Sequence, residues 1–178
     1  MARYSTARIA RLLHDSDNAP TADQKGEILE QLTRYVFERV PGVSFYAKNI
    51  LDGNRAHELD VVFWNLQKQS DICFLDAVII VECKNTAHPV SSAQVGWFVR
   101  KLQDRGATHG VLIALNGITG NNDEDNSAHS EVSSALVRDK IRVLVVTREE
   151  LLALHTTDNL VNLLKEKILQ LTLYKTIV

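Results

Sequence analysis

The segment 57–85 constrains the fold of this chain more than any other part of the sequence. It contains two apolar runs joined by a polar stretch, and both runs are typical of β-strands. Asp60 lies in the first strand, and Glu82 lies near the end of the second, two residues before Lys84. Side chains alternate along a strand, so we expect Glu82 and Lys84 on one face of the sheet and Cys83 on the other.

Charged side chains at the end of so apolar a strand need a physical reason. Burying a carboxylate or an ammonium is costly unless the group is paired or bound to a metal. Two carboxylates offer the hard oxygen ligands that Mg²⁺ prefers, and a divalent cation activates water and neutralises charge on phosphate. The sequence therefore predicts a cation held by Asp60 and Glu82 beside Lys84, used to cut a phosphodiester bond. The alternative is a salt bridge at a strand end, because acids and lysines two residues apart are common in strands.

Glu58 competes with Asp60 for the role of first acid. The two share strand parity and lie roughly 6.6 Å apart along the strand, so both could approach one cation. We favour Asp60 because the apolar residues 61–63 follow it and bury it more deeply. Asp76 shares parity with Glu82 but lies six residues before it, and we expect it outside the site.

The length of 178 residues suggests one domain, with residues 1–20 as a helical extension and 156–178 as a C-terminal helix and tail. The formal net charge is -2, so any DNA-binding surface has to be local. Cys73 and Cys83 lack the spacing of a metal site and are expected to be buried free thiols.

Residues 1–14 carry three arginines and no acid, a pattern shared by transit peptides and by short amphipathic helices. We favour the helix, because Ile9, Leu12 and Leu13 recur on one face. No apolar run approaches the length of a membrane span. These observations, with the two unpaired cysteines, lead us to expect a cytoplasmic protein that does not contact a membrane.

Apolar periodicity and capping residues predict the remaining elements. The expected helices cover residues 4–14, 21–40, 91–105, 127–139, 147–155 and 158–171. The expected strands cover residues 43–50, 57–64, 78–85, 110–115 and 141–146, with a polar turn at 65–71. The first three strands indicate an antiparallel meander, and the later strand–helix–strand unit indicates a parallel crossover. We therefore expect an α/β fold with a central mixed sheet flanked by helices.

Asp60, followed after a hairpin by Glu82-Cys83-Lys84, resembles the signature of the PD-(D/E)xK nuclease superfamily. Other segments resemble its Mrr-like branch, a type IV restriction endonuclease group named for cutting modified DNA. These segments are 26–30, 82–85, 110–113, 141–144 and 149–152. The resemblance covers about residues 25–154 and implies a restriction-endonuclease-like core around a metal-dependent nuclease site. No separate DNA-reading domain is found.

The resemblance also implies a role for each site residue. The implied catalytic residues are Asp60, Glu82, Lys84, Glu30 and Gln94. Asp60, Glu82 and the backbone carbonyl of Cys83 would hold Mg²⁺, for which Mn²⁺ would substitute. Lys84 would be the catalytic lysine and Glu30 an accessory acid. Gln94 would help to hold the site or the phosphate.

Several polar residues near the expected site are candidates for phosphate contacts. They are Lys48, Arg55, His57, Asn85, His88, Arg100 and Lys101. The alternative for each is an ordinary solvated side chain.

These observations favour a Mg²⁺-dependent DNA endonuclease of the restriction, defence or repair type. The family resemblance implies that it would leave a 5′-phosphate. A small chain with an apolar C-terminus suggests a homodimer that cuts both strands. One alternative is a non-catalytic DNA-binding or scaffold protein with the same fold. Another is a subunit of a larger complex in which a separate subunit supplies targeting.

Overall fold

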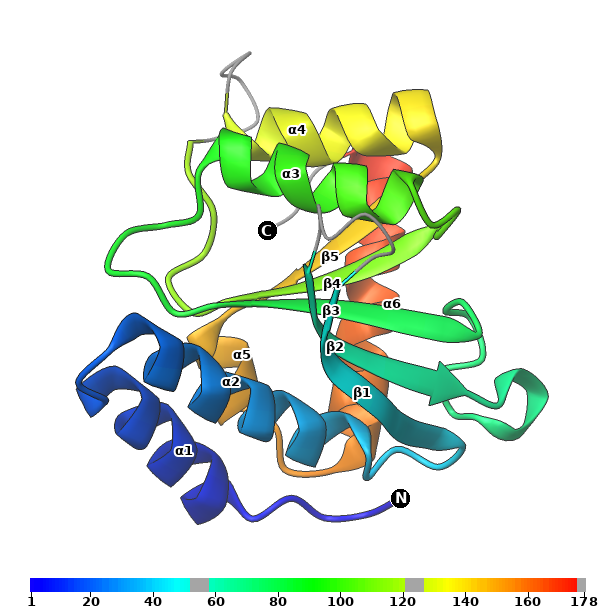
Figure 1. The fold of residues 1–178 in the computed structure, drawn as a ribbon. Helices are drawn as coiled ribbons and strands as arrows, with labels where there is room; N and C mark the ends of the chain where they lie inside the picture. The colour runs from blue at the N-terminus through cyan, green and yellow to red at the C-terminus, as the bar shows by residue number, and fades with distance from the viewer. Residues whose placement is uncertain (52–57, 121–126, 176–178) are drawn as a thin grey trace.

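The structure is a computed structural model that describes residues 1–51, 58–120 and 127–175. A five-stranded sheet lies between two layers of helices (Figure 1). The strands are β1 Val43–Leu51, β2 Glu58–Asn65, β3 Val78–Lys84, β4 His109–Ala114 and β5 Arg142–Val146. The α-helices are α1 Thr6–Asn18, α2 Ala22–Phe37, α3 Ser92–Gln103, α4 Ala128–Ser134, α5 Arg148–Leu152 and α6 Thr157–Tyr174. A 3₁₀ turn, Gln67–Gln69, follows β2, and a π-helical turn, Ala135–Asp139, extends α4.

The strand order in the sheet is β1-β2-β3-β4-β5. β1, β2 and β3 form an antiparallel meander, whereas β4 and β5 add to β3 in parallel. The predicted α/β class and mixed sheet are therefore confirmed. Helices connect the parallel strands, as crossover connections require.

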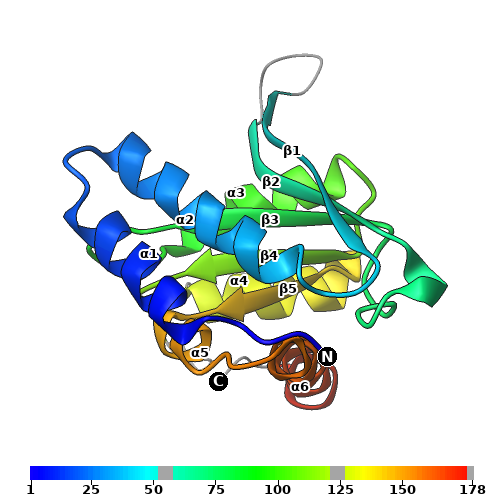
Figure 2. The same cartoon turned by 90° about the horizontal axis from the view of Figure 1, so that it is seen from below.

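Helices cover both faces of the sheet. α1 and α2 lie on one face, and α3 and α4 lie on the other (Figures 1 and 2). The core side of α2 is formed by Leu29, Leu32 and Val36, which recur at helical spacing and are all fully buried. From the other face, α3 approaches β4 so closely that a Cβ on Gly110 would lie 2.4 Å from the Leu102 side chain. Glycine at this position therefore sets the distance between α3 and the sheet.

Several element boundaries differ from those predicted. α1 continues through residues 15–18, beyond its predicted end at residue 14. Ser16 explains the extension, because it is fully buried and its hydroxyl donates to the Lys25 carbonyl at 2.8 Å. The connection between β2 and β3 agrees with the predicted strand limits, and beyond the predicted polar turn 65–71 it buries Ile72 and Leu75 in the core.

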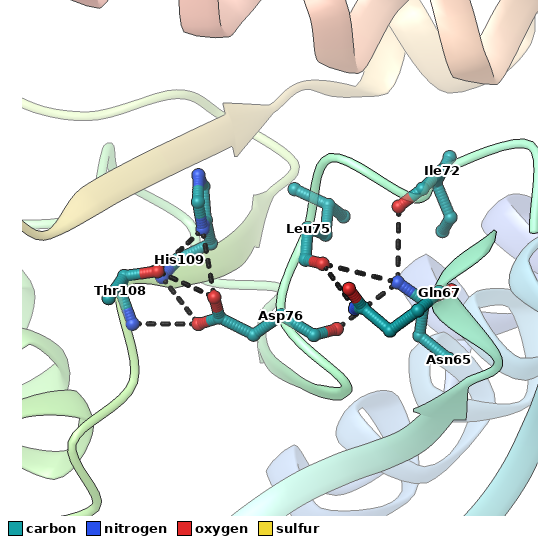
Figure 3. A network of polar contacts seen from close by, with 7 residues as sticks. All are labelled: Asn65, Gln67, Ile72, Leu75, Asp76, Thr108 and His109. Carbon is teal, nitrogen blue, oxygen red and sulfur yellow. Dashed lines mark hydrogen bonds and ion pairs between the residues drawn. The ribbon is translucent and has the colours of Figure 1, made fainter.

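Asn65 organises this connection, as Figure 3 shows. Its side chain is fully buried, and its amide donates to the carbonyls of Ile72, Leu75 and Asp76 at 3.1–3.3 Å. The Asp76 carboxylate in turn accepts from the backbone N–H groups of Thr108 and His109. Asp76 therefore fastens the start of β3 to the start of β4, outside the site, as expected.

The two cysteines differ in their surroundings. Cys83 is buried, as predicted, but Cys73 is exposed, because it lies in the β2–β3 connection rather than in a strand. Among the residues that the structure describes, no helix is long and apolar enough to span a bilayer.

Candidate active site

The candidate site lies where β2 and β3 separate. Their ladder ends at the pair Val61↔Val81, whereas β3 remains paired with β4 as far as Lys84. Just beyond this last pair, Asp60 Oδ2 accepts a hydrogen bond from the Cys83 backbone N–H at 2.8 Å. Within a strand the N–H and C=O of one residue point to the same side, so the Cys83 carbonyl also points toward β2. The Asp60 carboxylate and this carbonyl therefore share the opening between the two strands.

Glu82 is almost completely buried, at 3% exposure, and is paired on both of its oxygens. Oε1 lies 2.8 Å from Lys84 Nζ, and Oε2 lies 2.7 Å from Lys101 Nζ on α3. Cys83 faces the other side, where its sulfur lies 3.2 Å from the Thr33 hydroxyl on α2. The alternation that the sequence predicted for residues 82–84 is therefore confirmed.

Lys101 was a candidate for phosphate contact, but the structure places it differently. It is 5% exposed and directed at Glu82, so it is not part of a solvated basic surface. The sequence did contain a signal. Lys101 follows Gln94 by seven residues, which is nearly two helical turns, so the two lie on one face of α3. A helix that directs Gln94 toward the site therefore directs Lys101 toward it as well.

The ionisation of the site follows from burial and charge. Burial and the nearby negative charge of Glu82 raise the pKa of Asp60 to about 6, despite the Cys83 N–H and the lysines that oppose the shift. For Lys84, burial lowers the pKa, but the charge and hydrogen bond of Glu82 outweigh it, so the net pKa is raised. Lys84 therefore carries its proton at neutral pH, which favours electrostatic stabilisation over a role as general base.

Glu30 lies on the α2 side of the opening. It shares a hollow with Glu58, Asp60 and Cys83, while Lys48 Nζ lies 3.3 Å from Glu30 Oε2. That oxygen is buried, and Lys48 is its ion-pair partner. Burial raises the pKa of Glu30, although Lys48 opposes the shift. Glu58 lines the same hollow but is exposed, whereas Asp60 is largely covered.

A second hollow opens on the α3 side. Glu82 and Lys84 line it together with Gln94 and Trp97. Gln94 also has a structural role, because its side chain and Ser91 form the capping box that begins α3. Trp97 is 51% exposed and stands at the rim of this hollow. The structure thus brings Gln94 near the glutamate–lysine pair but uses its amide oxygen in the helix cap.

The other candidates for phosphate contact are placed differently. Arg55 and His57 lie outside the described residues. Asn85 donates to the Ser16 hydroxyl at 2.7 Å, so its amide fastens the end of β3 to α1. His88 and Arg100 are exposed, and Lys48 is exposed but paired with acids.

The residues at the opening fit a divalent cation by their chemistry. Asp60, the Cys83 carbonyl and Glu82 supply hard oxygen donors, and Glu30 adds a buried carboxylate oxygen that is paired with Lys48. Over residues 1–51, 58–120 and 127–175, no group of three or more His, Cys, Asp or Glu side chains is arranged to hold a metal. Mg²⁺ does not require such a group, because it usually binds one or two carboxylates together with water and phosphate.

A mixed sheet that opens beside two acids and a lysine defines the restriction-endonuclease-like class of fold. The comparison with protein families agrees with this class. Residues 23–154 match the model of the Mrr-type catalytic domain, described as a restriction endonuclease. The match covers most of the chain, which therefore belongs to this family of restriction-endonuclease-like nucleases. No curated protein matched the chain. The family generally uses divalent metal ions.

Proposed function

We propose that this protein is a Mg²⁺-dependent DNA endonuclease whose active site is the opening between β2 and β3. One observation carries the proposal. Glu82 and Lys84 follow Asp60 by 22 and 24 residues in the sequence, but all three lie together at this opening. The hydrogen bond between Asp60 and the Cys83 N–H and the 2.8 Å contact between Lys84 and Glu82 hold them there. Family membership supports the reaction class and DNA as the substrate.

Each residue contributes differently to the proposed reaction. Asp60, Glu82 and the Cys83 carbonyl would hold the cation. When bound, the cation supplies Lewis acidity toward a phosphate oxygen and water. The Cys83 N–H fixes one Asp60 oxygen and so orients the carboxylate. Lys84, which keeps its proton, donates a hydrogen bond to the phosphate or to the attacking water and offsets negative charge in the transition state.

Glu30 is proposed as an accessory acid. Its carboxylate lines the hollow that it shares with Lys48 and Asp60, where it can accept a hydrogen bond from a water molecule. Its raised pKa also suits brief proton storage. DNA would approach along exposed positions such as His88 and Arg100, because the net charge of -2 leaves no general attraction.

A specific observation favours one other function, a non-catalytic DNA-binding or scaffold subunit. Both oxygens of Glu82 are paired with lysines, so the carboxylate is already neutralised without a cation. A protein that had lost catalysis could keep such an arrangement for stability alone. The raised pKa of Asp60 argues the other way, because an acid kept at an electrostatic cost is typical of a functional site.

A cleavage assay separates the two functions. Purified protein is incubated with supercoiled and linear DNA, with Mg²⁺, with Mn²⁺ or with chelator. We expect metal-dependent cutting that Asp60→Asn and Lys84→Met abolish. Lys68→Met, which removes an exposed lysine outside the site, should cut like the wild type. If the wild type cuts no DNA with either metal, the endonuclease proposal is wrong.

The same assay addresses the homodimer and the targeting subunit, which remain predictions. A homodimer that cuts both strands should convert supercoiled plasmid directly to linear DNA, whereas a monomer should accumulate nicked circles. Sedimentation of the protein alone measures the oligomeric state. Weak cutting without sequence preference would be the result expected of a nuclease that depends on a separate targeting subunit.

A further inference from the structure

The site contains a second lysine that the PD-(D/E)xK signature does not include. Lys101 Nζ lies 2.7 Å from Glu82 Oε2, and the lysine is 5% exposed. Its neighbours on α3, Phe98 and Leu102, are fully buried, so the helix cannot turn Lys101 outward without disrupting the core. The Arg105 side chain also donates to the Lys101 carbonyl at 2.8 Å.

Lys101 changes the charge of the site. Asp60 and Glu82 with Lys84 alone would carry a formal charge of about -1, which attracts a cation. With Lys101 the two acids face two lysines, and the formal charge of the cluster is about zero. A divalent cation must therefore enter a cluster that is already neutral. Like charges that share a carboxylate repel each other, so Lys101 opposes the binding of the cation.

The two lysines are not equivalent. The Lys84 side chain is 28% exposed and borders the α3-side hollow, whereas the Lys101 side chain is 6% exposed. Lys84 can therefore leave Glu82 and remain hydrated, but Lys101 has no solvated position to move to. Glu82 Oε1 can therefore exchange the Lys84 ammonium for a metal cation, whereas Oε2 remains paired with Lys101.

We propose that Lys101 is a positioning residue that acts as the resident counter-charge of Glu82. It fixes Oε2, presents Oε1 to the cation and lowers the affinity of the site for that cation. It also makes Lys84 the ammonium released from Glu82 when the cation binds. The inference rests on the proposed function, because it assumes that Glu82 is a metal ligand.

The test measures cation binding by the intact protein without DNA, using Mn²⁺ and Mg²⁺ in calorimetry and in thermal unfolding. An ammonium on the far side of a carboxylate lies roughly 5 Å from a bound cation. Even with the dielectric constant of water, their repulsion corresponds to about tenfold in affinity. Lys101→Met should therefore bind Mn²⁺ about tenfold more tightly, or better. It should also gain more in melting temperature than the wild type when the ion is added.

The chain offers matched controls. Lys167 is also a buried lysine on a helix, at 4% exposure, and is paired with Glu150 far along the chain from the site residues. Lys167→Met loses a comparable ion pair but should bind Mn²⁺ like the wild type. Lys101→Arg keeps the charge and should restore wild-type affinity. Lys101→Gln removes the charge but keeps a donor for Glu82, so it repeats the test should the methionine variant fail to fold.

The outcomes distinguish the two proposals. If the wild type binds Mn²⁺ but Lys101→Met and Lys101→Gln bind it equally well or more weakly, the role of Lys101 is refuted and the nuclease site stands. If neither the wild type nor any Lys101 variant binds either ion, both the proposed function and this inference are overturned. Tighter binding in Lys167→Met as well would also refute the inference, since the effect would not be local.

Discussion

Asp60 should destabilise the folded protein at neutral pH, and Asp60→Asn should remove that cost. The carboxylate is largely buried and lies near the negative charge of Glu82, and both factors raise its pKa from 3.8 to about 6. In the unfolded chain the group ionises near its ordinary pKa. Ionisation at neutral pH is therefore less favourable in the folded state than in the unfolded state. Asparagine has nearly the same shape, and its carbonyl oxygen can still accept the Cys83 N–H.

The magnitude follows from the shift in pKa. One pH unit corresponds to about 1.4 kcal/mol, so a rise from 3.8 to about 6 costs the folded state about 3 kcal/mol above pH 7. The wild type should lose this stability as the pH rises from about 4 to about 6, because the unfolded state gives up its proton first. At pH 4 the wild type and Asp60→Asn should be equally stable. At pH 8 the variant should be more stable by about 1–3 kcal/mol, or roughly 3–10 °C in melting temperature.

Urea unfolding at pH 4 and pH 8 measures the difference directly. Asp71→Asn, at an exposed position in the β2–β3 connection, controls for the general effect of removing one negative charge. The same experiment with Mn²⁺ adds a second test. The ion should stabilise the wild type but not Asp60→Asn, and its effect on the wild type should fade below pH 6 as Asp60 takes up a proton. An Asp60→Asn variant that is less stable than the wild type at pH 8 would refute the reasoning.

Three further outcomes are expected. Lys84→Met should reduce plasmid cleavage by about 10²-fold or more while Mn²⁺ binding persists in calorimetry, because its ammonium stabilises the transition state. Asp76→Asn should lower stability at pH 7 by about 1–2 kcal/mol in urea unfolding, since hydrogen bonds from residues 108 and 109 outweigh burial and lower the pKa of Asp76. That contribution should vanish in the wild type as the pH falls below about 4. A thiol reagent should modify Cys73 in the native protein but Cys83 only after unfolding, because burial raises the pKa of Cys83 well above its usual value.

Much of the fold could be predicted from local pattern. The apolar runs around Asp60 and Glu82 indicated adjacent strands, and the alternation within 82–84 set which side chains share a face. The predicted helix 21–40 corresponds to α2, and its prediction followed from capping residues and helical periodicity. These features depend on neighbours within a few residues, which is why the sequence alone was sufficient for them.

Features that depend on distant partners could not be predicted in the same way. α1 continues through polar residues because Ser16 is held by Lys25 and Asn85, and Asn85 is 69 residues further along the chain. Asn65 is buried because carbonyls of the following connection turn back onto it. In each case the local composition suggests a solvated turn, and a tertiary hydrogen bond decides otherwise.

The burial of Lys101 in the site also depends on a distant partner and could not be predicted from local sequence. Helical periodicity places it next to the apolar stripe of α3, where a lysine is more often solvated than buried. Its burial depends on Glu82, which lies on a strand 19 residues earlier and has an oxygen directed at the helix. A charged residue on the border of an apolar stripe becomes informative only when a buried opposite charge is known to face it.

The acids near the two ends of β3 have pKa values that are shifted in opposite directions. Asp76, just before the strand, receives backbone and side-chain donors that lower its pKa and make its charge stabilising. Asp60, beside the far end, receives one backbone donor against burial and the charge of Glu82, so its pKa is raised. A sheet selected only for stability would place a neutral residue at Asp60. A binding site for a cation instead requires an acid at this position, although the acid lowers the free energy of unfolding. The unfavourable interaction between the buried carboxylates is relieved when a cation binds.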